Sequence, residues 1–163
     1  MRENTYKKML NFMCRHKILK NAAITLGKTI TIAVYIFYPM LLVYLYSIKS
    51  TQFLKILLIP LVSFIVLSII RYFLNMPRPY EKYDIKPLYN KKTKGKSCPS
   101  RHTFSAFVIG FSVMYVSFPL GALITFLAII LAITRVVCGI HFIRDVVWGL
   151  IAAVLSALMG LLF

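Results

Sequence analysis

The chain has 163 residues and a mass of 18.7 kDa, which is enough for one domain. Hydrophobic residues make up 60% of it, charged residues only 15%, and the mean hydropathy is +0.78, so the composition excludes a disordered chain and an ordinary water-soluble domain. The net charge of +16 would suit a nucleic-acid binder if the cations were spread over the surface. They gather instead in two blocks separated by apolar runs, which favours anionic lipid headgroups over nucleic acid as partners.

The first block of cations occupies residues 1–28 and precedes every apolar run. Apolar side chains recur there at i, i+3, i+4 and i+7, which places them on one face of a helix with cations on the other. This pattern predicts an amphipathic basic helix on the membrane surface, although a frayed basic tail would share its composition. Residues 1–20 lack the apolar core of a cleavable signal peptide. The apolar positions are Tyr6, Met9, Leu10 and Met13, and the cations are Arg2, Lys7, Lys8, Arg15, Lys17, Lys20 and Lys28.

Five apolar runs follow, and each is a candidate membrane-spanning helix. A span needs roughly 17–25 residues, so four runs are long enough, and the third requires its helix to start near Ser100. We therefore predict a single domain over residues 1–163, an all-α integral membrane bundle of about five transmembrane helices. The runs cover residues 29–48, 53–73, 103–118, 119–138 and 146–163.

The connection at residues 74–102 differs from the others in its length and polarity. Four prolines interrupt any helix in it, and nine cations fall between Arg71 and Arg101. A polar loop this long in so small a protein is typical of a functional segment, so we interpret residues 74–102 as a catalytic loop. The prolines are Pro77, Pro79, Pro87 and Pro99, and the cations are Arg71, Arg78, Lys82, Lys86, Lys91, Lys92, Lys94, Lys96 and Arg101.

One polar cluster stands out in the apolar last third of the chain. Polar residues at membrane depth are functional by default, although a boundary arginine that snorkels to the headgroups would explain Arg144. Snorkelling does not explain a His and an Asp at i and i+4. If a helix starts near His141, Asp145 lies one turn on, where its carboxylate would fix the imidazole tautomer and raise its proton affinity. From Thr103 onward the charged and histidine residues are Arg135, His141, Arg144 and Asp145.

Two further segments could bring phosphate-binding groups to this pair. Arg71 falls in the last turn of its span, where a cation suits the helix dipole, and Arg78 lies between two prolines in a rigid, extended turn. Ser100 is a candidate N-cap, and the backbone N–H groups that follow it would form an anion site. His102, in the first turn of that helix, is placed to protonate a group that leaves a bound phosphate.

Together these motifs resemble the type-2 phosphatidic acid phosphatase family, which shares its site with vanadium-dependent haloperoxidases. The family pattern is Lys-x6-Arg-Pro, then Pro-Ser-Gly-His, then Ser-Arg-x5-His-x3-Asp, and residues 71–145 have the same order and internal spacings. Three positions differ from the pattern. Arg71 stands in place of Lys and Thr134 in place of Ser, and Arg101 replaces Gly, where it could contact phosphate or a headgroup.

The resemblance implies a membrane phosphatase that needs no metal and no other cofactor. His141 would attack phosphorus to form a phosphohistidine, Asp145 would hold the other ring nitrogen, and His102 would protonate the leaving oxygen. The substrate would be a membrane lipid phosphate such as undecaprenyl pyrophosphate, phosphatidic acid or phosphatidylglycerol phosphate. The groups implied to hold the phosphoryl oxygens are Arg71, Arg78, Ser100, Arg101 and Arg135.

Other functions use some of the same features. A phosphotransferase would pass the phosphoryl group to another lipid, whereas a non-catalytic lipid-binding or transport protein would not need both histidines. A haloperoxidase is disfavoured by five spans.

The resemblance also implies a multi-pass protein of the cell membrane with its site on the extracytoplasmic face. The N-terminal segment would share that face with the catalytic loop, although the positive-inside rule would place both basic blocks in the cytoplasm.

Overall fold

The computed structural model describes residues 3–83, 85–89 and 93–162, and the regular structure within these ranges is entirely helical. Six of the helices have 13 residues or more, and α4 is a single turn of 4. The all-α prediction is confirmed. The helices are α1 (Glu3–Arg15), α2 (Lys17–Ser47), α3 (Phe53–Leu74), α4 (Pro79–Lys82), α5 (Arg101–Val113), α6 (Phe118–Val137) and α7 (Ile143–Met159). Arg2, Lys91, Lys92 and Phe163 lie outside the described residues.

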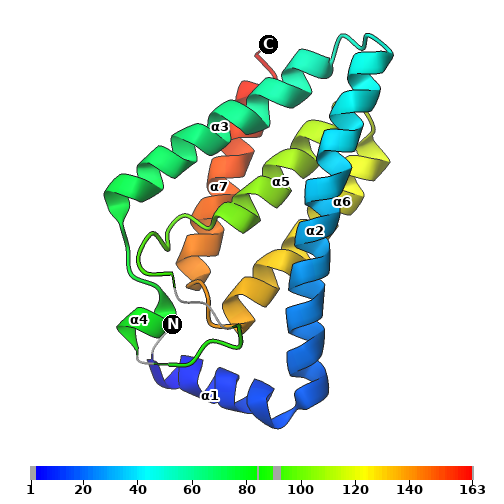
Figure 1. Ribbon diagram of the computed structural model, residues 1–163. Coiled ribbons are helices and arrows are strands. Elements are labelled where there is room, and N and C mark those ends of the chain that lie inside the picture. Colours follow the sequence, from blue (N-terminus) through cyan, green and yellow to red (C-terminus); the bar gives the residue numbers. More distant parts are fainter. Residues whose placement is uncertain (1–2, 84, 90–92, 163) are drawn as a thin grey trace.

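α5 lies at the centre of a bundle formed with α2, α3, α6 and α7 (Figure 1). Ten of its 13 residues are buried, and six of these, all apolar, form the main hydrophobic core with side chains from the surrounding helices. Gly110 allows α6 to approach closely, because a Cβ at this position would lie 2.6 Å from Oγ1 of Thr125. The short helix is thus enclosed on several sides by longer ones.

Three helices, α2, α3 and α6, are long and apolar enough to cross a membrane. Their outward faces carry large exposed apolar side chains, among them Ile36, Ile69 and Phe126, as expected for a surface in contact with lipid. α5 and α7 fall short of this length, with 13 and 17 residues. At 1.5 Å per residue α5 reaches only about 20 Å, less than the thickness of the hydrocarbon layer. The prediction of five spans is therefore confirmed for three helices within the described ranges.

The N-terminal basic segment forms two helices rather than one surface helix. The helix is interrupted at His16, which separates α1 from α2. α1 lies across the end of the bundle at a steep angle to α2 (Figure 1). The predicted apolar face of α1 exists, but it packs on the protein: Tyr6 and Leu10 form a second buried cluster with Ile85 and Phe142. This corrects the expectation that the apolar face lies on lipid.

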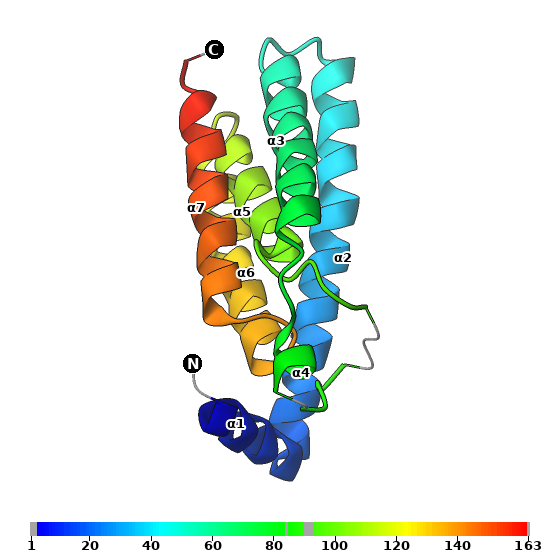
Figure 2. The same cartoon turned by 90° about the vertical axis from the view of Figure 1, so that its left-hand side faces the viewer.

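The segments that carry the predicted site lie at one end of the bundle. Figure 2 shows α1, α4 and the described parts of the loops on either side of α4 at this end, close to the start of α7. The C-terminal residues and the turns at 48–52 and 114–117 lie at the opposite end. This confirms the predicted grouping of the N-terminal segment with the catalytic loop.

Candidate active site

The predicted His–Asp pair forms at the start of α7, although His141 itself precedes the helix. Phe142 is the N-cap residue, and Asp145 lies in the first turn. The Asp145 carboxylate turns back and accepts a hydrogen bond from the backbone N–H of Phe142, with an N to Oδ2 distance of 3.0 Å. The helix therefore starts two residues after His141, close to the predicted start. The pair survives because this cap directs the carboxylate back toward His141.

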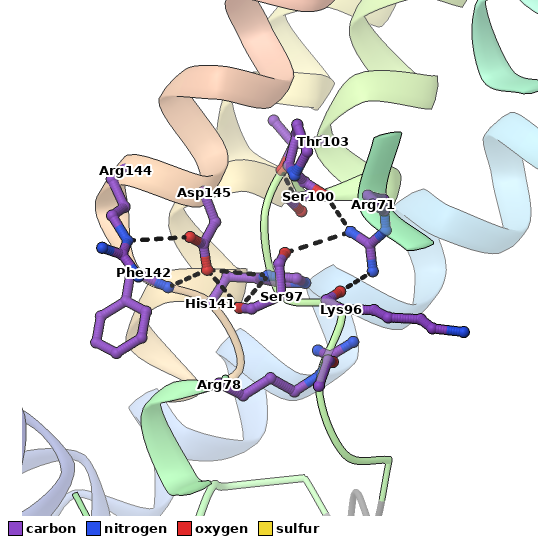
Figure 3. A network of polar contacts seen from close by, with 12 residues as sticks. Arg71, Arg78, Lys96, Ser97, Ser100, Thr103, His141, Phe142, Arg144 and Asp145 are labelled. Carbon is purple, nitrogen blue, oxygen red and sulfur yellow. Dashed lines mark hydrogen bonds and ion pairs between the residues drawn. The ribbon is translucent and has the colours of Figure 1, made fainter. Parts of the chain in front are cut away.

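His141 and Asp145 are buried almost completely, with 1% and 0% of their surfaces exposed. Nδ1 of His141 lies 3.6 Å from Oδ2 of Asp145, which is within ion-pair range but too long for a hydrogen bond. The Ser97 hydroxyl lies beside both: it donates to the same Oδ2 and is 3.4 Å from Nδ1 (Figure 3). Because Nδ1 faces the carboxylate, Nε2 is the ring nitrogen left for chemistry.

Ser97 is a site residue that sequence reasoning missed. It is fully buried, and its backbone N–H donates to the carbonyl of Met76 at 2.9 Å. Three residues later, the N–H of Ser100 donates to the carbonyl of Asp145 at 2.8 Å, which joins the loop to α7. Gly149 permits this close approach, because a Cβ there would lie 2.9 Å from the Ser100 carbonyl oxygen. In the sequence, Ser97 is one serine in a loop rich in polar residues, and nothing in that pattern singles it out as a site residue.

Arg71 and Arg78 lie where the sequence predicted, and both are buried. Arg71, in the last turn of α3, donates to the backbone carbonyls of Lys96, Ser97 and Pro99 and so holds the loop around the dyad (Figure 3). Arg78 has the predicted extended backbone, and its Nε donates to the Gly95 carbonyl at 3.2 Å. Nη1 of Arg78 is buried and has no hydrogen-bond partner among the described residues, so it can donate to an anion.

The first turn of α5 adds further positive potential to this end of the bundle. Ser100 is the N-cap residue as predicted, but its side chain does not cap the helix; it accepts a hydrogen bond from Oγ1 of Thr103 at 3.1 Å. Arg101 is exposed, and His102 beside it is half-buried. Burial lowers the pKa of Arg78, and the charge of Arg101 adds to this effect, so the two cations share one electrostatic neighbourhood.

The side chain of Arg135 does not join this cluster through any contact that the structure shows. Its Nη2 donates to Oγ1 of Thr31 at 2.8 Å and lies 3.4 Å from the Gly27 carbonyl, both on α2. Its guanidinium carbon lies 5.7 Å from the centre of the Tyr89 ring. Only the backbone of Arg135 touches the dyad, because its carbonyl accepts the N–H of His141 at 3.3 Å. The phosphate-binding role of Arg135 therefore stays a prediction.

Burial determines the charge of the His141 imidazole. Burial lowers the pKa of His141 from 6.5 to about 4, and the nearby Arg78 and Arg71 act in the same direction, while Asp145 opposes them. As predicted, Asp145 raises the pKa of His141, but the desolvation of the buried ring lowers that pKa by more. The ring is therefore neutral at neutral pH, which is the state that a nucleophile needs.

The surroundings of the dyad are rich in cationic and backbone donors. Arg144 adds another cation at the rim, with its Nε 3.5 Å from Oδ1 of Asp145. Within the described residues, no group of three His, Cys, Asp or Glu side chains could hold a metal ion. Such a cluster of guanidinium groups and helix N-termini is suited to bind and polarise a phosphoryl group.

The fold and this end of the bundle define a membrane phosphatase, and comparison with known proteins supports that class. The family model of the PAP2 superfamily matches residues 52–163, more than half of the chain, so the protein belongs to this superfamily of phosphatases. The resemblance seen in the motifs is thereby confirmed. The chain has no match among curated protein sequences.

Two solved structures share the fold. The crystal structure of Aquifex aeolicus LpxE has a TM-score of 0.77 at 21% identity, with 98% of this chain and 94% of that chain covered. The first transmembrane PAP2 type phosphatidylglycerolphosphate phosphatase from Bacillus subtilis has a TM-score of 0.57 at 16% identity, with 97% and 74% covered. At these identities the likeness concerns the fold alone, so the substrate must be argued from the site.

Proposed function

We propose that the protein hydrolyses the phosphomonoester or diphosphate headgroup of a membrane lipid through a phosphohistidine at His141. The observation that carries the proposal is the buried His141–Asp145–Ser97 cluster, placed among arginines where the N-termini of α5 and α7 meet. Phosphoryl transfer requires positioning and charge stabilisation above all, and this end of the bundle offers both.

The reaction has two balanced steps. In the first, neutral Nε2 of His141 attacks phosphorus, the bond from phosphorus to the lipid oxygen breaks, and His102 gives its proton to that oxygen. In the second, water attacks the phosphohistidine, the P–N bond breaks, and the proton of the water passes to His102. Asp145 holds Nδ1 during both steps and stabilises the positive charge that develops on the ring.

The lipid phosphate assignment follows from where the site lies relative to the apolar surfaces. The exposed faces of α2, α3 and α6 place the bundle in a bilayer, and the cationic end then lies near the headgroups. A substrate with an apolar tail could keep its tail in the bilayer while its phosphate reaches His141. In this arrangement α5 and α7 also lie at membrane depth, with α5 enclosed by the other helices and α7 exposing apolar side chains such as Trp148 and Leu155.

The direct test is phosphate release by the purified protein in detergent with excess EDTA present. The panel contains phosphatidic acid, phosphatidylglycerol phosphate and undecaprenyl pyrophosphate, and product analysis in water separates hydrolysis from transfer to an alcohol. We expect release from at least one of these lipids in EDTA, and inhibition by vanadate, which can mimic five-coordinate phosphorus. Release that disappears in EDTA and returns with Mg²⁺ would contradict the metal-independent mechanism.

We also propose that the site faces away from the cytoplasm. The chain carries its own probe, because Cys14 on α1 is exposed at the site end whereas Cys98 and Cys138 are buried. A membrane-impermeant maleimide should label Cys14 in intact cells, and Cys14→Ser should abolish the label. Labelling of Cys14 that requires permeabilised cells would place the site in the cytoplasm.

A further inference from the structure

Tyr6 links α1 to the segment that carries the proposed nucleophile. Its side chain is completely buried, and its hydroxyl donates to the backbone carbonyl oxygen of His141 at 2.9 Å. The two residues are 135 positions apart in the chain. The contact therefore depends on α1 lying across this end of the bundle, as Figure 1 shows.

The peptide unit between His141 and Phe142 is held on both of its sides. Its carbonyl accepts the hydrogen bond from Tyr6, and its N–H donates to Oδ2 of Asp145 at 3.0 Å. The same Oδ2 lies 3.6 Å from Nδ1 of His141. A rotation of this peptide plane would displace the His141 ring and the Asp145 anchor together.

Aromatic packing fixes the ring that supplies this hydroxyl. Tyr6 meets Phe142 edge to face, with ring centres 5.7 Å apart and planes at 83°, and its centre lies 6.1 Å from that of Tyr83. On the next turn of α1, Leu10 covers Gly139, where a Cβ would lie 3.4 Å from both Leu10 methyl carbons. α1 thus holds both ends of the segment 139–142.

We propose that Tyr6 is a positioning residue for the nucleophile, and that α1 serves to present it. This inference rests on the proposed phosphatase function. The reacting nitrogen must be placed to within a fraction of an ångström, and the hydrogen bond from Tyr6 holds one of the two sides of the peptide that sets this placement. Burial raises the pKa of Tyr6, with Asp145 adding to the effect, so the hydroxyl keeps its proton across the working pH range.

The test compares two Tyr→Phe substitutions in the full-length protein. Tyr6→Phe removes only the hydroxyl and keeps the ring. Tyr38→Phe is the matched control, because its hydroxyl donates to the Ile56 carbonyl at 2.8 Å and joins α2 to α3 away from the site. Steady-state phosphate release from phosphatidic acid in mixed micelles is measured well below the melting temperature of each variant.

We expect Tyr6→Phe to lower kcat by roughly 10-fold with KM changed less than about twofold, and Tyr38→Phe to leave both near the wild-type values. The rate of phosphoenzyme formation in a single turnover should fall with kcat. A kcat for Tyr6→Phe equal to that of Tyr38→Phe would overturn the positioning role. Absence of phosphate release by the wild-type protein from every lipid of the panel would instead overturn the proposed function, and the role of Tyr6 with it.

A second variant decides the question if Tyr6→Phe does not fold. Leu10→Ala leaves the Tyr6 hydroxyl in place but loosens α1 over Gly139. It should lower kcat in the same direction by roughly threefold, again with little change in KM. A folded Leu10→Ala protein with the wild-type kcat would show that α1 does not position the loop.

Discussion

The two ends of the bundle bury polar groups in different ways. At the site end Arg71, Arg78, His141 and Asp145 are each no more than 5% exposed. At the opposite end, uncharged hydroxyls bond to backbone carbonyls, as Tyr115 does to Ala157 at 2.7 Å. A groove of about 700 Å³ also lies there, lined mainly by apolar side chains of α3 and α7.

The buried charges of the site end serve function, whereas the buried hydroxyls of the opposite end serve stability. Burial of a charge costs several kcal/mol unless partners compensate it, whereas a hydroxyl bonded to a carbonyl is close to neutral or mildly stabilising. The protein concentrates its costly burials at one end, around one histidine. The groove at the other end lacks that concentration of buried charge, so a groove by itself is a poor guide to the active site in this fold.

The largest effect should come from the nucleophile. His141→Ala removes the atom that attacks phosphorus, so kcat should fall by roughly 10⁴-fold or more while the melting temperature stays near that of the wild type. Phosphate release measured with circular dichroism on the same samples checks this. Substantial activity in the folded variant would show that this end of the bundle is not the catalytic end.

Asp145→Asn should lower kcat by roughly 10²- to 10⁴-fold, because the imidazole loses the group that orients it. The carboxylate raises the pKa of His141 against the effect of burial. Its removal should therefore lower that pKa further and move the acid limb of kcat/KM to lower pH. A pH profile of the variant that matches the wild type in rate and acid limb would contradict the dyad.

Arg135 tests whether a residue bonded to α2 belongs to the site. Arg135→Ala should lower kcat by roughly 10²- to 10³-fold, the cost of one lost transition-state donor. Thr31→Val is the matched control, since it removes the closer of the two α2 partners of Arg135 but keeps the guanidinium, and kcat should change less than about threefold. Equal and small effects of both substitutions would show that Arg135 serves only to link α6 to α2.

Ser97→Ala should have a smaller effect, roughly a 10-fold loss in kcat, because the dyad remains but its carboxylate loses one hydrogen bond. Without the serine, Oδ2 of Asp145 can interact more strongly with Nδ1 of His141. The pKa of His141 should rise, and the acid limb should move to higher pH, opposite to Asp145→Asn. An acid limb that moves in the same direction in both variants would show that Ser97 and His141 do not compete for Oδ2 of Asp145.

The smallest effect is expected at the opposite end. Tyr115→Phe removes one partly buried hydrogen bond to α7, so the free energy of unfolding should fall by about 1 kcal/mol. Thermal unfolding in detergent measures this loss, and kcat should stay within about twofold of the wild type. A large loss of activity in the folded variant would show that the two ends are coupled.

The motifs predicted the family and much of the site because their chemistry depends on spacing along the chain. His141 and Asp145 were predicted from a four-residue interval, and Arg78 from two flanking prolines. Ser97 and Tyr6 were missed as partners because their contacts join segments distant in sequence. The apolar pattern of α1 indicated that Tyr6 is on the buried face, but not what covers that face.

Side-chain direction and helix length were also beyond the sequence pattern. The spacing places Arg135 six residues before His141, yet the packing of α2 against α6 determines where its guanidinium points. α5 was expected to reach residue 118 because its apolar run does. The helix instead ends at Val113, where the chain turns into α6. The apolar run continues through the turn, where Val116 and Phe118 are exposed, so hydropathy alone did not mark the end of the helix.

The most direct test of the account is to trap the covalent intermediate. Wild-type protein is mixed with phosphatidic acid labelled in its phosphate, in detergent with EDTA, and is quenched in alkali, in which phosphohistidine is stable. The phosphohistidine mechanism predicts a labelled enzyme whose label maps to the peptide that contains His141, is lost in acid and is absent from His141→Ala. A label on another residue, or phosphate release by the wild type without any labelled enzyme, would contradict it.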